Sequence, residues 1–210
     1  MVRWLAIPLA LALAWLAFTV SPLWSLYDLA QAVRRHDVAY IESHVNFRTL
    51  RLSLVRQITG AVRAASDTDL DLEPRDRQRL NDVAYGLALA LAETLVTPET
   101  VMDLLDNGWP DKLDIERPAD LKPEGLAIRS AGRLLPYYTS LEMRGFRAVV
   151  IPIPPEAPRA ERTRIRLRLR GLSWRLVDIE MADILRAQIA AKLGRALARA
   201  KLGASAGEEK

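Results

Sequence analysis

The chain has 210 residues, of which 50% are hydrophobic and 27% are charged, and its formal net charge is +4. This length accommodates one short apolar segment and one domain with its own core, and the charged fraction excludes a protein that crosses a membrane many times. The absence of cysteine excludes disulfides, thiolate nucleophiles, cysteine-based zinc sites and a lipid-modified cysteine.

The first feature along the chain is an uncharged apolar stretch over residues 4–20, which follows Arg3. Extended to residue 24, it reaches the roughly 20 residues that a membrane-spanning helix needs. Because positive charge stays on the cytoplasmic side of a span, the stretch predicts a single-pass anchor in a bacterial inner membrane, with the N-terminus in the cytoplasm. Residues 1–24 are therefore expected to be a membrane anchor or uncleaved signal, with the following domain in the periplasm.

Two alternatives to an anchor stay open. The alanines at positions 10, 12 and 14 form small-residue pairs that a signal peptidase could accept. Cleavage there would leave an apolar new terminus that includes Trp15 and Phe18, which is unfavourable in water. The stretch could also be a buried core helix. Either an anchor or a cleaved signal would place the domain outside the cytoplasm.

Helical periodicity follows the apolar stretch. Ser21 and Pro22 form the pair of N-cap and first helical residue that begins many helices, and Asp37 and Asn46 are placed to cap a second and a third helix. The second helix is expected to bury Val38, Ile41 and Val45. The third is expected to bury Phe47, Leu50, Leu54, Ile58 and Val62 and to end near Gly60.

Two further segments complete the helical half. Residues 66–79 are polar and predict a loop or an exposed helix start. Residues 83–96 are apolar but too short to span a bilayer, so they predict a fully buried helix. A Thr-Pro pair at positions 97 and 98 then predicts a helix that Gly108 ends.

Alternating side chains predict strands in the second half, after a connection rich in Pro, Asp, Lys and Gly at residues 107–125. Short turns between the strands predict an antiparallel meander. The expected strands cover residues 137–143, 146–153, 164–170 and 174–181.

A helix over residues 182–202 is expected to close the domain, before a disordered tail at residues 203–210. The whole chain therefore predicts an α+β fold: an N-terminal transmembrane helix, a helical half, an antiparallel β-meander and a closing C-terminal helix. Residues 25–202 are expected to form a single extracytoplasmic domain.

Three stretches resemble a bacterial domain-of-unknown-function family, number 2939. They are SPLWSLYDLAQAVRRHD at residues 21–37, VNFRTLRLSLVRQI at 45–58 and GLSWRLVDIEM at 171–181. Relatives usually carry Asp where this chain has Asn46, and both residues cap helices. The resemblance implies an anchored or exported α+β domain without an assigned activity. The order of elements is also similar to nuclear-transport-factor-2-like or cystatin-like folds, which is an analogy of fold alone.

One row of charge suggests a binding surface. Four arginines alternate along one predicted strand and project from one face of it, about 7 Å apart. They are Arg164, Arg166, Arg168 and Arg170. Such a row could contact anions or lipid headgroups through phosphates, an acidic polymer or a partner's carboxylates. The alternative is a solvated sheet face that charge protects from edge pairing.

Several aromatic residues could line a pocket between the sheet and the helices, or could pack in the core without a ligand. They are Trp109, Tyr137, Tyr138, Phe146 and Trp174. A pocket there would suit a small hydrophobic or anionic ligand.

Patterns of metal and catalytic sites are missing from the sequence. His36 and His44 lack helical metal-pair spacing, and the Asp-rich run at residues 67–71 lacks the later Gly and Glu of a calcium loop. Because no catalytic triad or phosphate-binding loop appears either, we assign no catalytic residue, metal or cofactor.

The expected function is a non-enzymatic binding or protein-interaction module that residues 4–20 hold at the inner membrane. Two alternatives are a small-ligand or lipid carrier with a pocket between the sheet and the helices at 47–62 and 83–96, and an enzyme of unrecognised type. Nucleic acid is not an expected partner, because the domain is predicted to lie outside the cytoplasm and lacks an aromatic strand motif.

Overall fold

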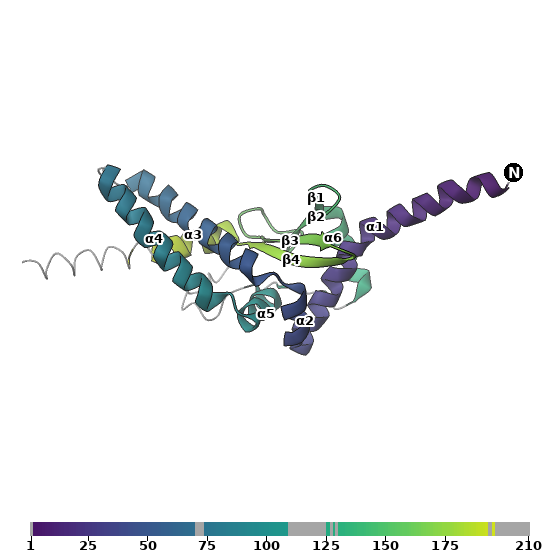
Figure 1. Cartoon of the computed structure of the whole chain (residues 1–210), viewed down its shortest axis with the longest axis horizontal. Helices are drawn as coiled ribbons and strands as arrows, with labels where there is room; N and C mark the ends of the chain where they lie inside the picture. The colour runs from purple at the N-terminus through teal and green to yellow at the C-terminus, as the bar shows by residue number, and fades with distance from the viewer. Residues whose placement is uncertain are drawn as a thin grey trace, which may run out of the picture.

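A computed structural model describes residues 2–69, 74–108, 125–126, 128, 130–192 and 195. The described chain contains a long N-terminal apolar helix, further helices, a four-stranded antiparallel sheet and a C-terminal helical segment over residues 183–192 (Figure 1). The predicted α+β fold class is therefore confirmed. The predicted tail at residues 203–210 and most of the predicted connection at 107–125 lie outside the described residues.

Helix α1 (Val2–Arg35) continues through the position at which the sequence predicts a new helix. Pro22 has no N–H to offer the carbonyl of Phe18, four residues earlier. The hydroxyl of Ser21 donates to that carbonyl over 2.8 Å and so satisfies it within the helix. The prediction that Ser21 caps a separate helix is wrong, because its side chain instead supports a proline inside a continuous one.

The two halves of α1 have different surroundings. Side chains from Ile7 to Ala17 are exposed, and residues 7–20, which we call the arm, extend away from the domain in Figure 1. Between Leu23 and Val33 the helix instead buries one apolar face in the domain core. The described residues include one helix long and apolar enough to cross a membrane, and this helix is α1.

Helices α2 (Val38–His44) and α3 (Phe47–Asp69) begin at the predicted caps. The backbone N–H of Tyr40 donates to Asp37 Oδ1 over 3.0 Å, and that of Thr49 donates to Asn46 Oδ1 over 3.2 Å. The predicted apolar stripe of α3 is buried or half-buried. Val38 is 36% exposed rather than buried, because residues 35–39 form an open corner between α1 and α2.

Helix α4 (Pro74–Leu95) runs antiparallel to α3, and the two form a hairpin at the end of the molecule opposite the arm (Figure 1). An alanine at every fourth position of α4 is buried, at Ala84, Ala88 and Ala92. The apolar side chains Val83 and Leu87 are exposed. The prediction of a fully buried helix is therefore wrong, because the small alanines let α3 pack closely on one face and no described element covers the other.

Helix α5 (Pro98–Asn107) begins and ends as the sequence predicts. The hydroxyl of Thr97 accepts a hydrogen bond from the backbone N–H of Thr100 over 3.3 Å. Gly108 ends the helix with φ 72°, a left-handed conformation that favours glycine. The helix packs against α1 and α2.

The four strands form the predicted meander. They are β1 (Glu142–Met143), β2 (Ala148–Ile153), β3 (Thr163–Arg170) and β4 (Ser173–Glu180). Each strand pairs antiparallel with the next, so the order in the sheet is β1-β2-β3-β4. This arrangement confirms the antiparallel meander.

The first predicted strand is mostly helical. A 3-10 helix η1 (Ala131–Leu134) leads into α6 (Leu135–Ser140), and only the following β1 is extended. Pro136 occupies the start of α6, where a proline is tolerated, and the hydroxyl of Ser140 donates back to its carbonyl over 2.9 Å. The prediction of a strand over residues 137–143 is wrong, because so short an alternation also fits a single helical turn whose Tyr137 points inward.

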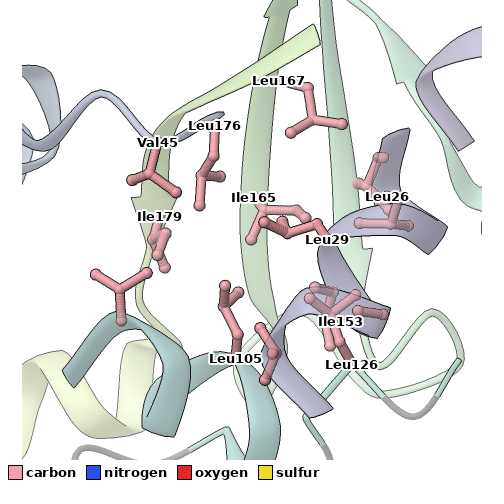
Figure 2. Packing of buried hydrophobic residues seen from close by; sticks show 14 of the residues in the cluster. Leu26, Leu29, Val45, Leu105, Leu126, Ile153, Ile165, Leu167, Leu176 and Ile179 are labelled. Carbon is pink, nitrogen blue, oxygen red and sulfur yellow. The ribbon is translucent and has the colours of Figure 1, made fainter. Parts of the chain in front are cut away.

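The core lies between the inner face of the sheet and the helices that cover it (Figure 2). Leu26 of α1, Ile41 of α2 and Ile165 of β3 have no exposed surface. Burying a side chain of this size contributes about 1.5–3 kcal/mol. Figure 2 shows Leu26 and Leu29 beside Ile165, so the second half of α1 is a core element of the domain.

A second apolar cluster joins α3, α4 and the helical segment at 183–192. Gln57 of α3 connects it to the end of β4, since its amide nitrogen donates to the carbonyl of Ile179 over 2.9 Å and its amide oxygen accepts from the N–H of Met181 over 2.9 Å. The side chain thus satisfies two backbone groups just where the sheet ends.

Candidate functional site

Strand β3 sorts its side chains between two faces of the sheet. Ile165 and Leu167 point into the core, whereas the alternating arginines point outward. We call the outer surface around Arg164, Arg166, Arg168 and Arg170 the arginine face. On this face β2 contributes only small or apolar neighbours, namely Ala148, Val150 and Pro152 opposite Arg168, Arg166 and Arg164.

A β-bulge places carboxylates at one end of the arginine face. The register between β3 and β4 shifts between Arg166 and Leu167, so that Leu176 and Ile179 both reach the core. As a result Asp178 and Glu180 lie on the outer face. Glu180 forms an ion pair with Arg164, and Asp178 Oδ2 lies 3.5 Å from Arg166 Nη1.

The other end of the arginine face carries positive charge without carboxylate partners. Arg168 lies opposite Arg175 of β4, and Arg170 lies opposite Ser173. Among the described residues, none of these three arginines forms an ion pair. The turn between β1 and β2 adds Arg147, whose guanidinium donates to the carbonyl of Leu169 over 3.4 Å.

The arginine face forms the floor of an open hollow of about 990 Å³. Eight arginines line the hollow against two acidic residues, Asp178 and Glu180, so its surface is strongly positive. The arginines outside β3 come from α3, the β1–β2 turn and the β2–β3 connection; they are Arg56, Arg144, Arg147 and Arg159. Arg144 is neutralised by Glu142, with 2.8 Å between Arg144 Nη2 and Glu142 Oε2.

A second hollow of about 830 Å³ adjoins the first, between α3, β4 and the segment at 183–192. The two share Arg56, Arg166, Asp178 and Glu180. Its walls are small residues of α3 and of the facing segment, including Gly60. Oxygen Oδ1 of Asp178 is buried there without a hydrogen-bond partner.

The described residues enclose an apolar cavity that is too small for a lipid. The apolar cavity between α3, α5 and the segment at 183–192 measures about 60 Å³. Sites for small molecules usually measure about 300–1,000 Å³. The two larger hollows are open and are lined by charged side chains.

The predicted pocket-lining aromatics lie in different places. Tyr137 and Trp174 are buried in the main core, Tyr138 is partly exposed on α6, and Phe146 is exposed in the β1–β2 turn. Trp109 lies outside the described residues. The structure therefore does not gather these four described residues around one cavity.

The two histidines are also separate. His36 ends α1 with φ 53°, whereas His44 stacks on Tyr40 with ring centroids 3.9 Å apart. Burial, together with the nearby carboxylates of Asp28 and Asp37, raises the pKa of Tyr40 above 10.0. In the part of the chain that the structure describes, no cluster of three or more His, Asp or Glu side chains could hold a metal ion.

A family model described as "Protein of unknown function (DUF2939)" matches residues 11–104. The match covers less than half of the chain, so residues 11–104 are similar to this family. The matched region extends from the arm to α5, so the sheet and its arginine face lie beyond it, as does the resembling stretch at 171–181. No curated protein and no solved structure matches the chain. The nuclear-transport-factor-2-like or cystatin-like analogy therefore stays a prediction.

Sequence reasoning identified the four arginines of β3, with Arg159 nearby in sequence, but it missed Arg56, Arg144 and Arg147. Arg56 belongs to a helix more than a hundred residues earlier, and Arg147 lies in a turn within a segment that the alternation assigned to a strand. The pairing of β2 with β3 is the signal that could have brought Arg147 and Arg170 together, because in an antiparallel pair the start of one strand lies beside the end of the other.

Proposed function

We propose that α1 anchors this protein in a bacterial inner membrane and that its domain is a non-enzymatic binding module in the periplasm, with the arginine face as its binding surface for an anionic group. The observation that carries the proposal is the lining of the larger hollow by eight arginines and two acids. Guanidinium groups form paired hydrogen bonds with phosphate or carboxylate oxygens, and these are the ligand groups that such a lining favours.

The distribution of charge supports binding over a merely solvated face. Ion pairs with Asp178 and Glu180 neutralise one end, whereas Arg168 and Arg175 lie directly opposite each other at the other end. Like charges in directly opposed positions destabilise a sheet by tenths of a kcal/mol to about 1 kcal/mol. An anion bound between Arg168 and Arg175 would attract both guanidinium groups and offset their mutual repulsion. We therefore expect ligands to bind at the Arg168–Arg170 end of the arginine face.

The apolar pattern of α1 supports the anchor. The arm is apolar on every side, as is usual for helices in lipid, whereas a surface helix of a soluble domain has a polar face. Arg3 before the arm favours a cytoplasmic N-terminus. A single cysteine placed at Glu156, in the exposed β2–β3 connection, would test the orientation in whole cells. It should react with a membrane-impermeant maleimide without lysis, and reaction only after lysis would contradict a periplasmic domain.

The binding surface can be tested with the full chain in phosphatidylcholine nanodiscs and a fluorescent oligoglutamate peptide as the probe. Reversing two charges in the R168E/R170E variant should weaken binding about tenfold or more, because each charge-assisted hydrogen bond contributes about 1.5–3 kcal/mol. The matched control is R63E/R79E, which makes the same charge change at exposed positions on the α3–α4 hairpin. Equal weakening in both variants would show a net-charge effect and would contradict a defined binding face.

Inorganic pyrophosphate, added as a competitor, would distinguish phosphate from carboxylate as the preferred group. If pyrophosphate displaces the peptide at a lower concentration than free glutamate does, phosphate is the preferred group. Turnover of a substrate by the purified protein in an activity screen would contradict the non-enzymatic part of the proposal.

A further inference from the structure

Two turns of the sheet lie against the arm of α1. Phe146 in the β1–β2 turn contacts Trp15, with ring centroids 6.5 Å apart in an edge-on arrangement. At the start of β4, the ring of Trp174 lies 6.4 Å from that of Phe18, and its Nε1 donates to the hydroxyl of Ser21 over 2.9 Å. The strands are antiparallel, so the β1–β2 and β3–β4 turns share this end of the sheet, and the β2–β3 connection lies at the other.

The tips of both turns are apolar and face outward. Phe146 is 71% exposed, and Leu172 in the β3–β4 turn is 100% exposed. Trp24 of α1 is also exposed and lines a hollow of about 480 Å³ together with Leu172. Isolated exposed apolar residues are common, but these three surround the base of an apolar arm.

The length of α1 fixes the depth of these tips if the arm spans a bilayer. At about 1.5 Å per residue, residues 4–20 cover about 25 Å, which is less than the roughly 30 Å of a hydrocarbon core. The span must therefore use the whole arm, because the domain encloses the helix from Leu23 onward. Trp15 lies five residues before Val20, or about 7–8 Å inside the lipid. The ring centroid of Phe146 lies 6.5 Å from that of Trp15, so the Phe146 ring must also lie on the lipid side of this boundary.

We infer that the β1–β2 turn (residues 144–147) and the β3–β4 turn (residues 171–172) form a second membrane contact, which inserts Phe146 and Leu172 into the leaflet that faces the domain. This inference depends on the membrane anchor proposed above. The basic side chains Arg147 and Arg170, at the same end of the sheet, contact the lipid phosphates around the two tips.

Charge along the sheet agrees with this placement. Arg170 lies at the end of β3 nearest the arm, and Arg164 is six residues farther away, or about 20 Å. The carboxylate partners Asp178 and Glu180 belong to the far end. Positive charge without partners is thus concentrated where anionic headgroups would lie, and each such residue near an anionic surface contributes about 1 kcal/mol of attraction.

The bilayer is the occupant favoured over a protein partner because the apolar tips are continuous with the arm. Any surface that covered Phe146 would also have to cover Trp15, which it contacts. A protein that did so would displace lipid from the helix at that depth.

Single cysteines can test the insertion, since the chain contains none of its own. Full-length F146C and L172C variants are labelled with the environment-sensitive dye NBD and reconstituted in nanodiscs that contain nitroxide-labelled lipid. L13C in the arm serves as the lipid-exposed reference, and E156C at the opposite end of the sheet serves as the water-exposed reference. We expect blue-shifted emission and strong quenching at positions 146 and 172, close to the values for L13C and at least twofold above the quenching of E156C.

The outcomes separate the two proposals. Quenching at position 13 without quenching at 146 and 172 would overturn the second membrane contact and leave the anchor intact. Absence of quenching at position 13 would overturn both.

The role of the arginines has its own test. In the L172C background, the R147E/R170E variant should lose about half or more of its quenching in nanodiscs of equal phosphatidylcholine and phosphatidylglycerol, because glutamates are repelled by anionic headgroups. The matched R63E/R79E variant in the same background should retain its quenching. Unchanged quenching in R147E/R170E would contradict contact between these arginines and the phosphates.

Discussion

The two halves of α1 differ in apolar content and in environment. The arm exposes its apolar side chains, whereas the half from Leu23 to Val33 buries them under the sheet. In the second half, polar residues such as Ser25, Asp28 and Gln31 alternate with the buried positions, and in the arm they are rare. The comparison teaches that polar residues spaced between apolar ones mark the half of the helix that packs on its own domain, whereas the half without them stays exposed.

The largest expected effect is a difference in unfolding free energy between two leucine-to-alanine variants, one in each half of α1. Leu26→Ala should lower the free energy of unfolding by about 2–5 kcal/mol, because it leaves a cavity at a fully buried position. Leu13→Ala makes the same chemical change in the arm and should alter domain stability by less than about 0.5 kcal/mol. Guanidinium unfolding of both variants in detergent, followed by tryptophan fluorescence, measures the difference. Equal losses would mean that the arm also belongs to the folded core.

A smaller effect is expected at the junction of the halves. The Ser21 hydroxyl donates to the carbonyl of Phe18 and accepts from Trp174 Nε1. Ser21→Ala removes both bonds and should cost about 1–3 kcal/mol, since both partners are left unsatisfied. Ser43→Ala, at an exposed serine on α2, provides the control. Unchanged unfolding of Ser21→Ala would indicate that water replaces the hydroxyl.

The smallest effect concerns Tyr40, which faces the buried half of α1. Burial and the carboxylates of Asp28 and Asp37 raise its pKa in the folded protein above 10.0, so the folded state retains this proton more firmly than the unfolded state does. The resulting stability is complete below pH 10 and is lost as the pH rises through the folded pKa. Tyr40→Phe should therefore unfold less readily than the parent at alkaline pH, whereas Tyr85→Phe on α4 should resemble the parent. Identical alkaline unfolding of parent and Tyr40→Phe would contradict the shift.

Local signals in the sequence predicted much of the fold. Asp37, Asn46 and Thr97 cap helices as expected, because a side-chain oxygen next to a helix start satisfies a free N–H whatever the tertiary context. The alternation of arginines with Ile165 and Leu167 predicted β3 and its buried face for a similar reason.

Features that depend on distant partners were not predictable in the same way. Exposure of Leu87 depends on which face of α4 meets α3, and the apolar composition of that helix does not specify it. The bulge that brings Asp178 opposite Arg166 depends on strand register, and the approach of Arg56 depends on how α3 crosses the sheet. The sequence thus indicated the row of arginines but not the hollow around it.

Helix α1 passes from the arm into the core without a break in its helical structure. If the arm spans a bilayer as proposed, a tilt of α1 that matches the thickness of that bilayer would also turn the core elements packed around its second half. The α3–α4 hairpin lies at the end farthest from the arm (Figure 1) and would move through the widest arc. Bilayer thickness would thereby set how far from the lipid surface the exposed apolar side chains of α4 are held.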